Sequence, residues 1–157
     1  DTAPGEGTTV TIFLPAEDAS TAGTEEQTSG ARQGRGETIL VVEDAEGLRG
    51  AIEAGLASFG YRVLTAAHGR QALDVATDER IDLVLTDVIM PEMGGEALLR
   101  RLRRAHPDLR VVAMTGHVMD QDVHRLRASG FSAALPKPFS IEELTDIVRS
   151  VLDASRP

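Results

Sequence analysis

Short apolar runs alternate with longer amphipathic stretches from about residue 37 to the end of the chain. The runs are rich in β-branched residues and predict five strands, at residues 38–42, 61–66, 82–86, 110–114 and 132–135. Apolar residues at helical spacing mark four of the stretches that follow the strands, as in Leu48, Ile52 and Leu56. Ser140 and Glu143 form a capping-box pattern before the last stretch. The alternation predicts five strands and five helices.

Strands that alternate with helices predict a parallel sheet with helices on both of its faces. The segments ILVV and LVL are apolar throughout, as expected of strands that are buried on both sides. The predicted fold is therefore a doubly wound α/β domain over residues 37–154.

Residues 1–36 differ in composition from the rest of the chain. Residues 1–15 end in one β-prone run, at residues 8–14. Residues 16–36 are small, polar and acidic, and Ala is their one apolar residue type. A segment of this composition buries too little apolar surface to offset the entropy lost on ordering, so it is predicted to be a flexible linker.

Composition narrows the function classes. The formal net charge of −9 argues against a nucleic-acid-binding surface, because phosphate backbones attract clustered Lys and Arg. The absence of Cys excludes disulfides and thiolate metal sites and fits a reducing cytosol. No apolar run reaches the roughly 20 residues that cross a bilayer, and no signal-peptide pattern is visible. We expect a cytoplasmic fragment without membrane contact, processed or cut from a longer protein that could itself be membrane-anchored.

Polar residues follow four of the five predicted strands. In open α/β sheets, ligands bind at the carboxyl ends of the strands. Glu43 and Asp44 follow the first strand, Asp87 the third, Thr115 the fourth and Lys137 the fifth. Three carboxylates, one hydroxyl and one ammonium are therefore predicted to converge on one edge of the sheet.

This set of groups indicates phosphoryl-transfer chemistry. Three neighbouring carboxylates repel one another unless a cation intervenes. An oxygen-only set with few protein ligands suits Mg²⁺, which keeps waters and accepts phosphate oxygens as ligands. A hydroxyl and an ammonium neutralise phosphoryl oxygens, and a carboxylate can be the nucleophile that becomes an acyl phosphate.

The segments ILVVEDA, LVLTDVIMPEMGG, VVAMTG and LPKPFS resemble, in order and spacing, the marker segments of response-regulator receiver domains. The resemblance implies a flavodoxin-like fold with strand order 2-1-3-4-5 and a phosphorelay function. It implies that Asp87 is the phosphoacceptor, that Asp44 and Asp87 bind Mg²⁺ directly, and that Glu43 binds it through water. The backbone carbonyl of Ile89 would complete the metal site.

The resemblance also implies roles for residues on the last two strands. Thr115 would be the switch hydroxyl and Lys137 the ammonium that contacts the phosphoryl group. Pro138 resembles the family's proline after the lysine, often preceded by a cis bond.

Three positions depart from the family pattern. The acidic pair is Glu-Asp, where Asp-Asp is common. Ala134 stands where the family usually has an aromatic switch residue. Ile89, two residues after the acceptor, is apolar and cannot orient an attacking water.

The segment PGEGTTVTIFLP resembles the end of the ATP-binding domain of sensor histidine kinases. A kinase end at residues 1–15, a linker at 16–36 and a receiver at 37–154 resemble the order in a hybrid sensor histidine kinase. The kinase's nucleotide-binding segments are absent, so this fragment is expected to catalyse only its own phosphorylation, and whether to class it as an enzyme stays open. The expected partners are the phosphohistidine domain of a histidine kinase or a histidine phosphotransfer protein.

Three other functions compete with a phosphoacceptor module. A hydrolase with an aspartyl-phosphate intermediate needs a second Asp two residues after the nucleophile, where this chain has Ile89. The receiver half of a DNA-binding regulator is disfavoured by the lack of a basic surface and by a chain that stops at Pro157. A scaffold that has lost phosphorylation is disfavoured by the intact set of five polar residues.

Overall fold

The structure is a computed structural model that describes residues 2–3, 7–8, 33–116 and 120–154, with the backbone alone described at 2–3, 7–8 and 120–123. Near the N-terminus, β1 (Thr2–Ala3) and β2 (Gly7–Thr8) pair in antiparallel orientation. Most of the predicted strand at residues 8–14, and the predicted linker up to residue 32, lie outside the described residues. The predicted boundaries at 1–15, 16–36 and 37–154 therefore stay predictions.

Five strands form one parallel sheet, as predicted. They are β3 (Thr38–Val42), β4 (Arg62–Ala66), β5 (Leu83–Asp87), β6 (Arg110–Thr115) and β7 (Ala133–Pro136). Their order across the sheet is β4-β3-β5-β6-β7, which is the predicted order 2-1-3-4-5 in chain order. The helices that follow the strands are α2 (Glu46–Ser58), α3 (Gly69–Asp78), α4 (Gly95–Ala105), α5 (Asp120–Ala128) and α6 (Ile141–Asp153).

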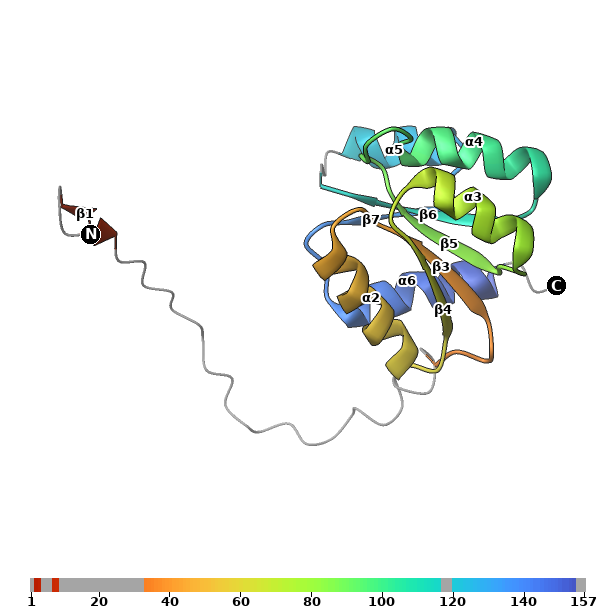
Figure 1. Cartoon of the computed structure of the whole chain (residues 1–157), viewed down its shortest axis with the longest axis horizontal. Helices are drawn as coiled ribbons and strands as arrows, with labels where there is room; N and C mark the ends of the chain where they lie inside the picture. Colours follow the sequence, from red (N-terminus) through yellow and green to blue (C-terminus); the bar gives the residue numbers. More distant parts are fainter. Residues whose placement is uncertain (1, 4–6, 9–32, 117–119, 155–157) are drawn as a thin grey trace.

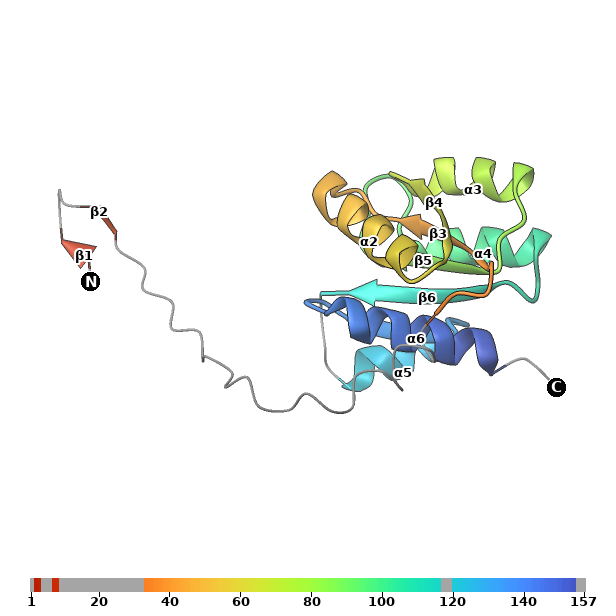
Figure 2. The same ribbon diagram turned by 90° about the horizontal axis from the view of Figure 1, so that it is seen from below.

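The helices form two layers around the sheet (Figures 1 and 2). Helices α3, α4 and α5 cover one face, and α2 and α6 cover the other. Successive residues of a strand point to opposite faces. Leu40 and Val42 pack in the core on the side of α3 to α5, whereas Ile39 and Val41 pack in the core under α2 and α6. All four are fully buried, which explains why residues 39–42 of this strand are all apolar.

The strand register brings the carboxyl ends of the strands to one edge of the sheet. Val42 of β3 lies opposite Thr86 of β5, and Asp87 lies opposite Met114 of β6. Thr115, the last residue of β6, lies opposite Pro136 of β7. The residues that follow each strand therefore meet at this edge.

The two helices that flank this edge begin differently. Helix α6 begins at the predicted capping box, in which Ser140 Oγ accepts from Glu143 N at 3.2 Å and Glu143 Oε2 accepts from Ser140 N at 2.8 Å. Helix α2 begins after Ala45, whose side chain makes no cap, and it contains Gly47, Gly50 and Gly55. Because each helical Gly costs about 1 kcal/mol relative to Ala, α2 depends on contacts beyond its own backbone.

An ion-pair network around the buried Arg149 joins the start of β3 to the end of α6. Arg149 is 6% exposed, and its Nη1 donates to Glu37 Oε1 at 2.8 Å. Its Nε donates to Asp153 Oδ2 at 3.0 Å. Just before β3, Gly34 N donates to the carbonyl of Phe59 at 2.7 Å, so residues 33–36 of the predicted linker contact the domain. Among the helices of the described ranges, none is long and apolar enough to cross a membrane.

Candidate functional site

The acidic pair leaves β3 and turns directly into α2. Glu43 N still donates to Ala66 O of β4 at 3.1 Å, so Glu43 extends the sheet by one residue. Its side chain is 2% exposed, whereas Asp44 is exposed. One carboxylate of the pair is thus fixed inside the edge of the sheet, and the other faces outward.

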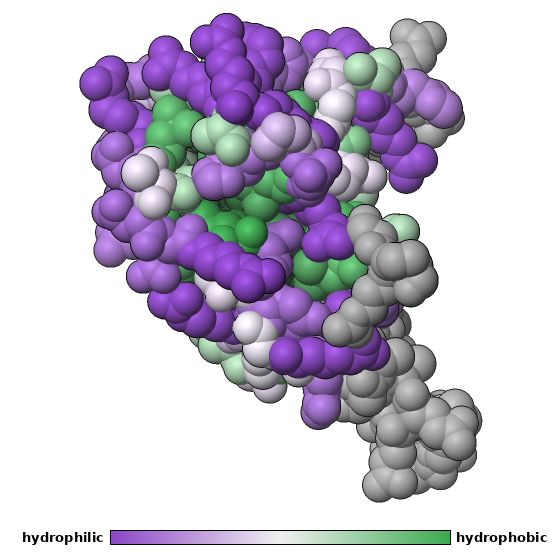
Figure 3. Space-filling model, turned by 90° about the vertical axis from the view of Figure 1, so that its right-hand side faces the viewer, coloured by the Kyte–Doolittle hydropathy of each residue, from purple (hydrophilic) through white to green (hydrophobic). Residues whose placement is uncertain are grey.

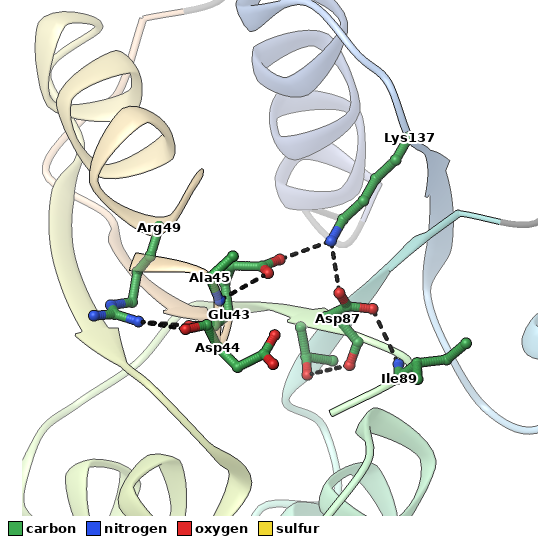
Figure 4. Close-up of polar contacts among 8 residues, drawn as sticks. Glu43, Asp44, Ala45, Arg49, Asp87, Ile89 and Lys137 are labelled. Carbon is green, nitrogen blue, oxygen red and sulfur yellow. Dashed lines mark hydrogen bonds and ion pairs between the residues drawn. The ribbon is translucent and has the colours of Figure 1, made fainter. Parts of the chain in front are cut away.

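Asp87 ends β5, the central strand, with its carboxylate beside the acidic pair (Figure 4). Its side chain is 14% exposed. Asp87 Oδ1 accepts from Ile89 N at 3.0 Å, which fixes the carboxylate relative to the loop that follows. The predicted contribution of Ile89 is its carbonyl oxygen. The contact found here is made by its amide, and the residue is 72% exposed.

Lys137 reaches across the edge from the end of β7 and joins two of the carboxylates. Its Nζ donates to Asp87 Oδ2 at 2.6 Å and to Glu43 Oε2 at 2.7 Å (Figure 4). Burial alone would lower the pKa of Lys137, but the hydrogen bonds to Asp87 and Glu43 outweigh it and raise the pKa above its ordinary value. The lysine is therefore a stable cation at neutral pH.

Thr115 and the segment around Lys137 meet through their backbones. Thr115 is 6% exposed, and its carbonyl accepts from Lys137 N at 2.7 Å. The Lys137–Pro138 peptide bond is cis, as the resemblance implied. The hydrogen bond from Lys137 N to Thr115 O holds the end of β7 against the end of β6, so the Lys137 side chain lies toward Asp87.

Ala134 of β7 is half-buried and packs against the core on the side of α3 to α5.

The loop after Asp87 is held by a close backbone approach to the start of α4. Gly95 N donates to Val88 O at 3.0 Å. A Cβ at Gly95 would lie 2.5 Å from the carbonyl oxygen of Asp87, closer than any side chain tolerates. The glycine at position 95 therefore has a steric reason: only a glycine lets the helix begin against the loop.

The donor atoms of the site fit a divalent cation. One carboxylate oxygen from each of Glu43, Asp44 and Asp87 lies within 4.8 Å of the other two. The cluster contains three carboxylates and one ammonium, that of Lys137, so it has an excess of negative charge. An oxygen-only set of this kind matches the preference of Mg²⁺. The sequence prediction that these three carboxylates converge is confirmed by their positions.

Arg49 is a polar contact of the site that sequence reasoning missed. Its Nη1 donates to Glu43 O at 2.8 Å and to Asp44 O at 3.4 Å (Figure 4). The available signal was an arginine in the first turn of the helix that follows an acidic pair. It is weak, because contacts from a side chain to backbone carbonyls leave no characteristic residue pattern.

A hollow lies at the opposite edge of the sheet, at the amino ends of the strands. It has a volume of about 550 Å³, and its lining includes Ile81, Asp82, Leu109 and Arg110, which lie at the amino ends of β5 and β6. Figure 3 shows this side of the molecule, where a depression has apolar residues at its base and polar residues around its rim. The hollow contains neither the acidic cluster nor Lys137, so the groups predicted to carry chemistry lie at the other edge.

The fold and the carboxyl edge of the sheet together define a class of protein. Its members are doubly wound α/β domains with an acidic cluster and a lysine at the carboxyl ends of the strands. Comparison with known proteins gives the family. The family model for the response regulator receiver domain matches residues 39–149, and the chain belongs to this family.

Individual relatives agree with that assignment. The chain is 38% identical to the sensor kinase CckA of Brucella abortus, over 98% of this chain but only 17% of the kinase. It is 36% identical to the sporulation initiation phosphotransferase F of Bacillus subtilis, over 74% of this chain and 94% of that protein. Among solved structures, the chemotaxis protein CheY4 of Vibrio cholerae matches with a TM-score of 0.70 and 30% identity, over 74% of this chain and 98% of CheY4.

Proposed function

We propose that Asp87 accepts a phosphoryl group from a phosphohistidine, as the receiver in a two-component phosphorelay. The observation that carries the proposal is the meeting of Glu43, Asp44, Asp87 and Lys137 at the carboxyl edge of the sheet. Membership of the receiver family supports it.

Asp87 suits the acceptor role better than Glu43. Glu43 is 2% exposed, and its two oxygens accept from Ala45 N and Lys137 Nζ. Asp87 is more accessible and is oriented by Ile89 N on one oxygen and by Lys137 on the other. A carboxylate held in this way is pre-positioned for attack.

The reaction is a transfer between two nucleophiles. An oxygen of Asp87 attacks the phosphorus of the phosphohistidine, the phosphorus–nitrogen bond breaks, and the imidazole keeps the electron pair. The product on this chain is an acyl phosphate. The Lys137 ammonium, 2.6 Å from Asp87, would then contact a phosphoryl oxygen, and the Thr115 hydroxyl would contact another.

Glu43, Asp44 and Asp87 would hold Mg²⁺, together with the carbonyl of Ile89. When bound, the ion supplies positive charge that neutralises the carboxylates and the phosphoryl oxygens. The chain's own contribution is to keep the ligand oxygens at one edge through β3 and β5 and to keep Lys137 charged.

We further infer that the parent protein is a hybrid sensor histidine kinase. The alignment with the sensor kinase CckA spans 98% of this chain, so it includes most of residues 1–36 as well as the receiver. That supports assigning residues 1–15 to the end of a kinase ATP-binding domain and 16–36 to a linker.

The proposal is tested with a phosphorylated histidine phosphotransfer protein as donor. Mixed with this chain and Mg²⁺, the donor should lose its phosphohistidine while the chain gains the label. Asp87→Asn should gain none, and Asp108→Asn, which removes an exposed carboxylate at the opposite edge, should behave as wild type. Phosphoryl transfer to Asp87→Asn at the wild-type rate would rule the proposal out.

A further inference from the structure

We propose that Arg49 is a positioning residue for the acidic pair. By holding the carbonyl oxygens of Glu43 and Asp44, it would keep the turn between β3 and α2 in the conformation that presents both carboxylates to the cation. The inference rests on the proposed function, because it assigns Arg49 a part in the same site.

The contacts of Arg49 link the start of α2 to the turn that precedes it. Arg49 N donates to Ala45 O at 2.9 Å, which places the residue in the first turn of α2. Its side chain then folds back, and one nitrogen, Nη1, reaches both Glu43 O at 2.8 Å and Asp44 O at 3.4 Å. Figure 4 shows the guanidinium on the side of the turn away from Asp87. Two consecutive peptide groups of the turn are thus held by one side chain.

Beyond Glu43, whose N donates to Ala66 O of β4, the turn has few other hydrogen bonds among the described residues. Ala45 gives α2 no side-chain cap, and Gly47 stands in the first helical turn. The other hydrogen bond described inside the turn runs from Ala45 N to Glu43 Oε1 at 3.3 Å. That bond uses a carboxylate oxygen of the metal cluster, so it competes with ligand binding. Arg49 uses backbone carbonyls instead and occupies no carboxylate oxygen.

Positioning and simple charge predict opposite effects of removing Arg49. As a nearby positive charge, Arg49 would repel a cation, so its removal would strengthen Mg²⁺ binding. As a positioning residue, it pre-orders Asp44 and Glu43, so its removal would weaken binding. Groups that orient metal ligands typically account for about 10–100-fold in affinity.

The test compares Arg49→Met with wild type and with Arg100→Met, a matched loss of one positive charge from an exposed arginine on α4. Calorimetric Mg²⁺ titration of the full chain should show affinity reduced about tenfold in Arg49→Met and unchanged in Arg100→Met. The rate of phosphorylation by acetyl phosphate at subsaturating Mg²⁺ should fall with it. Arg49→Lys keeps the charge, but its nitrogen lies one atom closer to the backbone than Nη1 does, so it should bind Mg²⁺ less tightly than wild type.

A second readout needs no metal. In ion-free protein, the backbone amide resonances of Asp44 and Ala45 should shift in Arg49→Met and stay in place in Arg100→Met. Equal or tighter Mg²⁺ binding by Arg49→Met overturns the inference, and so do unchanged Asp44 and Ala45 amides. If Arg49→Met fails to unfold cooperatively, Arg49→Lys decides by the same criteria. Wild type that binds no Mg²⁺ contradicts the proposed function itself and removes the basis of this inference.

Discussion

At the scale of single residues, Lys137 connects the ends of three strands. It comes from the end of β7 and contacts Glu43 after β3 and Asp87 at the end of β5. The sequence predicted an ammonium at this edge, in contact with a phosphoryl group. It did not predict that the same ammonium bridges two of the carboxylates, because a bridge depends on side-chain conformations that residue order does not determine.

The steric role of Gly95 leads to a prediction about the loop after Asp87. Gly95→Ala should destabilise the domain by about 1–3 kcal/mol, the usual cost of forcing an extra carbon into a packed site, because its Cβ would collide with the carbonyl of Asp87. Urea denaturation measures the change. Gly47→Ala is the matched control, since its Cβ meets nothing within 4 Å; it should stabilise α2 by about 0.5–1 kcal/mol. A Gly95→Ala variant as stable as wild type would show that the loop can move away.

At the scale of elements, the strands were predicted to within about one residue at each end, because β-branched runs bounded by turn residues are a strong signal. Helix α3 left no clear periodicity in the sequence. Its buried helical positions are Gly69, Ala72 and Ala76, small residues whose spacing does not stand out from the exposed positions. The order of strands came from the family resemblance, since pairing between distant segments is not visible in local patterns.

The turn between β3 and α2 gives a prediction about Mg²⁺. Because the ion relieves repulsion among Glu43, Asp44 and Asp87, Mg²⁺ at 100 times its dissociation constant should stabilise the domain by roughly 2.7 kcal/mol. Asp44→Ala should remove most of this gain, as expected for a direct ligand. Thermal unfolding with and without Mg²⁺ measures it.

The control for this experiment is Glu46→Ala, which removes a neighbouring exposed carboxylate in the first turn of α2. Its Mg²⁺-dependent gain should match wild type even if its baseline stability differs. An Asp44→Ala variant that keeps the full gain would place the ion elsewhere.

At the scale of the whole molecule, the ion pairs of Arg149 with Glu37 and Asp153 join the two ends of the described domain. Burial on its own would raise the pKa of Glu37, but hydrogen bonds from Arg35 N and the Arg149 guanidinium outweigh it and lower the pKa below its ordinary value of 4.5. A lowered carboxyl pKa means that the folded state favours the ionised form. This stabilisation is present above pH 4.5 and is lost as the pH falls through the folded pKa.

Glu37→Gln should therefore be less stable than wild type by about 1–3 kcal/mol at neutral pH, because it weakens a part-buried charged hydrogen bond. The difference should shrink as the pH falls from 4.5 through the lowered folded pKa of Glu37, because the wild-type carboxylate then also loses its charge. Denaturant unfolding at a series of pH values measures both effects. The exposed pair of Arg62 and Glu79, at 3.0 Å, supplies the control: Glu79→Gln should cost less than about 1 kcal/mol. A Glu37→Gln deficit that is independent of pH would contradict this account.

The central claim is that Asp87 is the phosphoacceptor and that transfer to it depends on Mg²⁺. Intact-mass spectrometry after incubation with acetyl phosphate tests it most directly, on wild type and Asp87→Asn, each with Mg²⁺ and with a chelator. We expect one added phosphoryl group on wild type with Mg²⁺, little with the chelator, and none on Asp87→Asn in either condition. Equal labelling of Asp87→Asn, or wild-type labelling unaffected by the chelator, would contradict the claim.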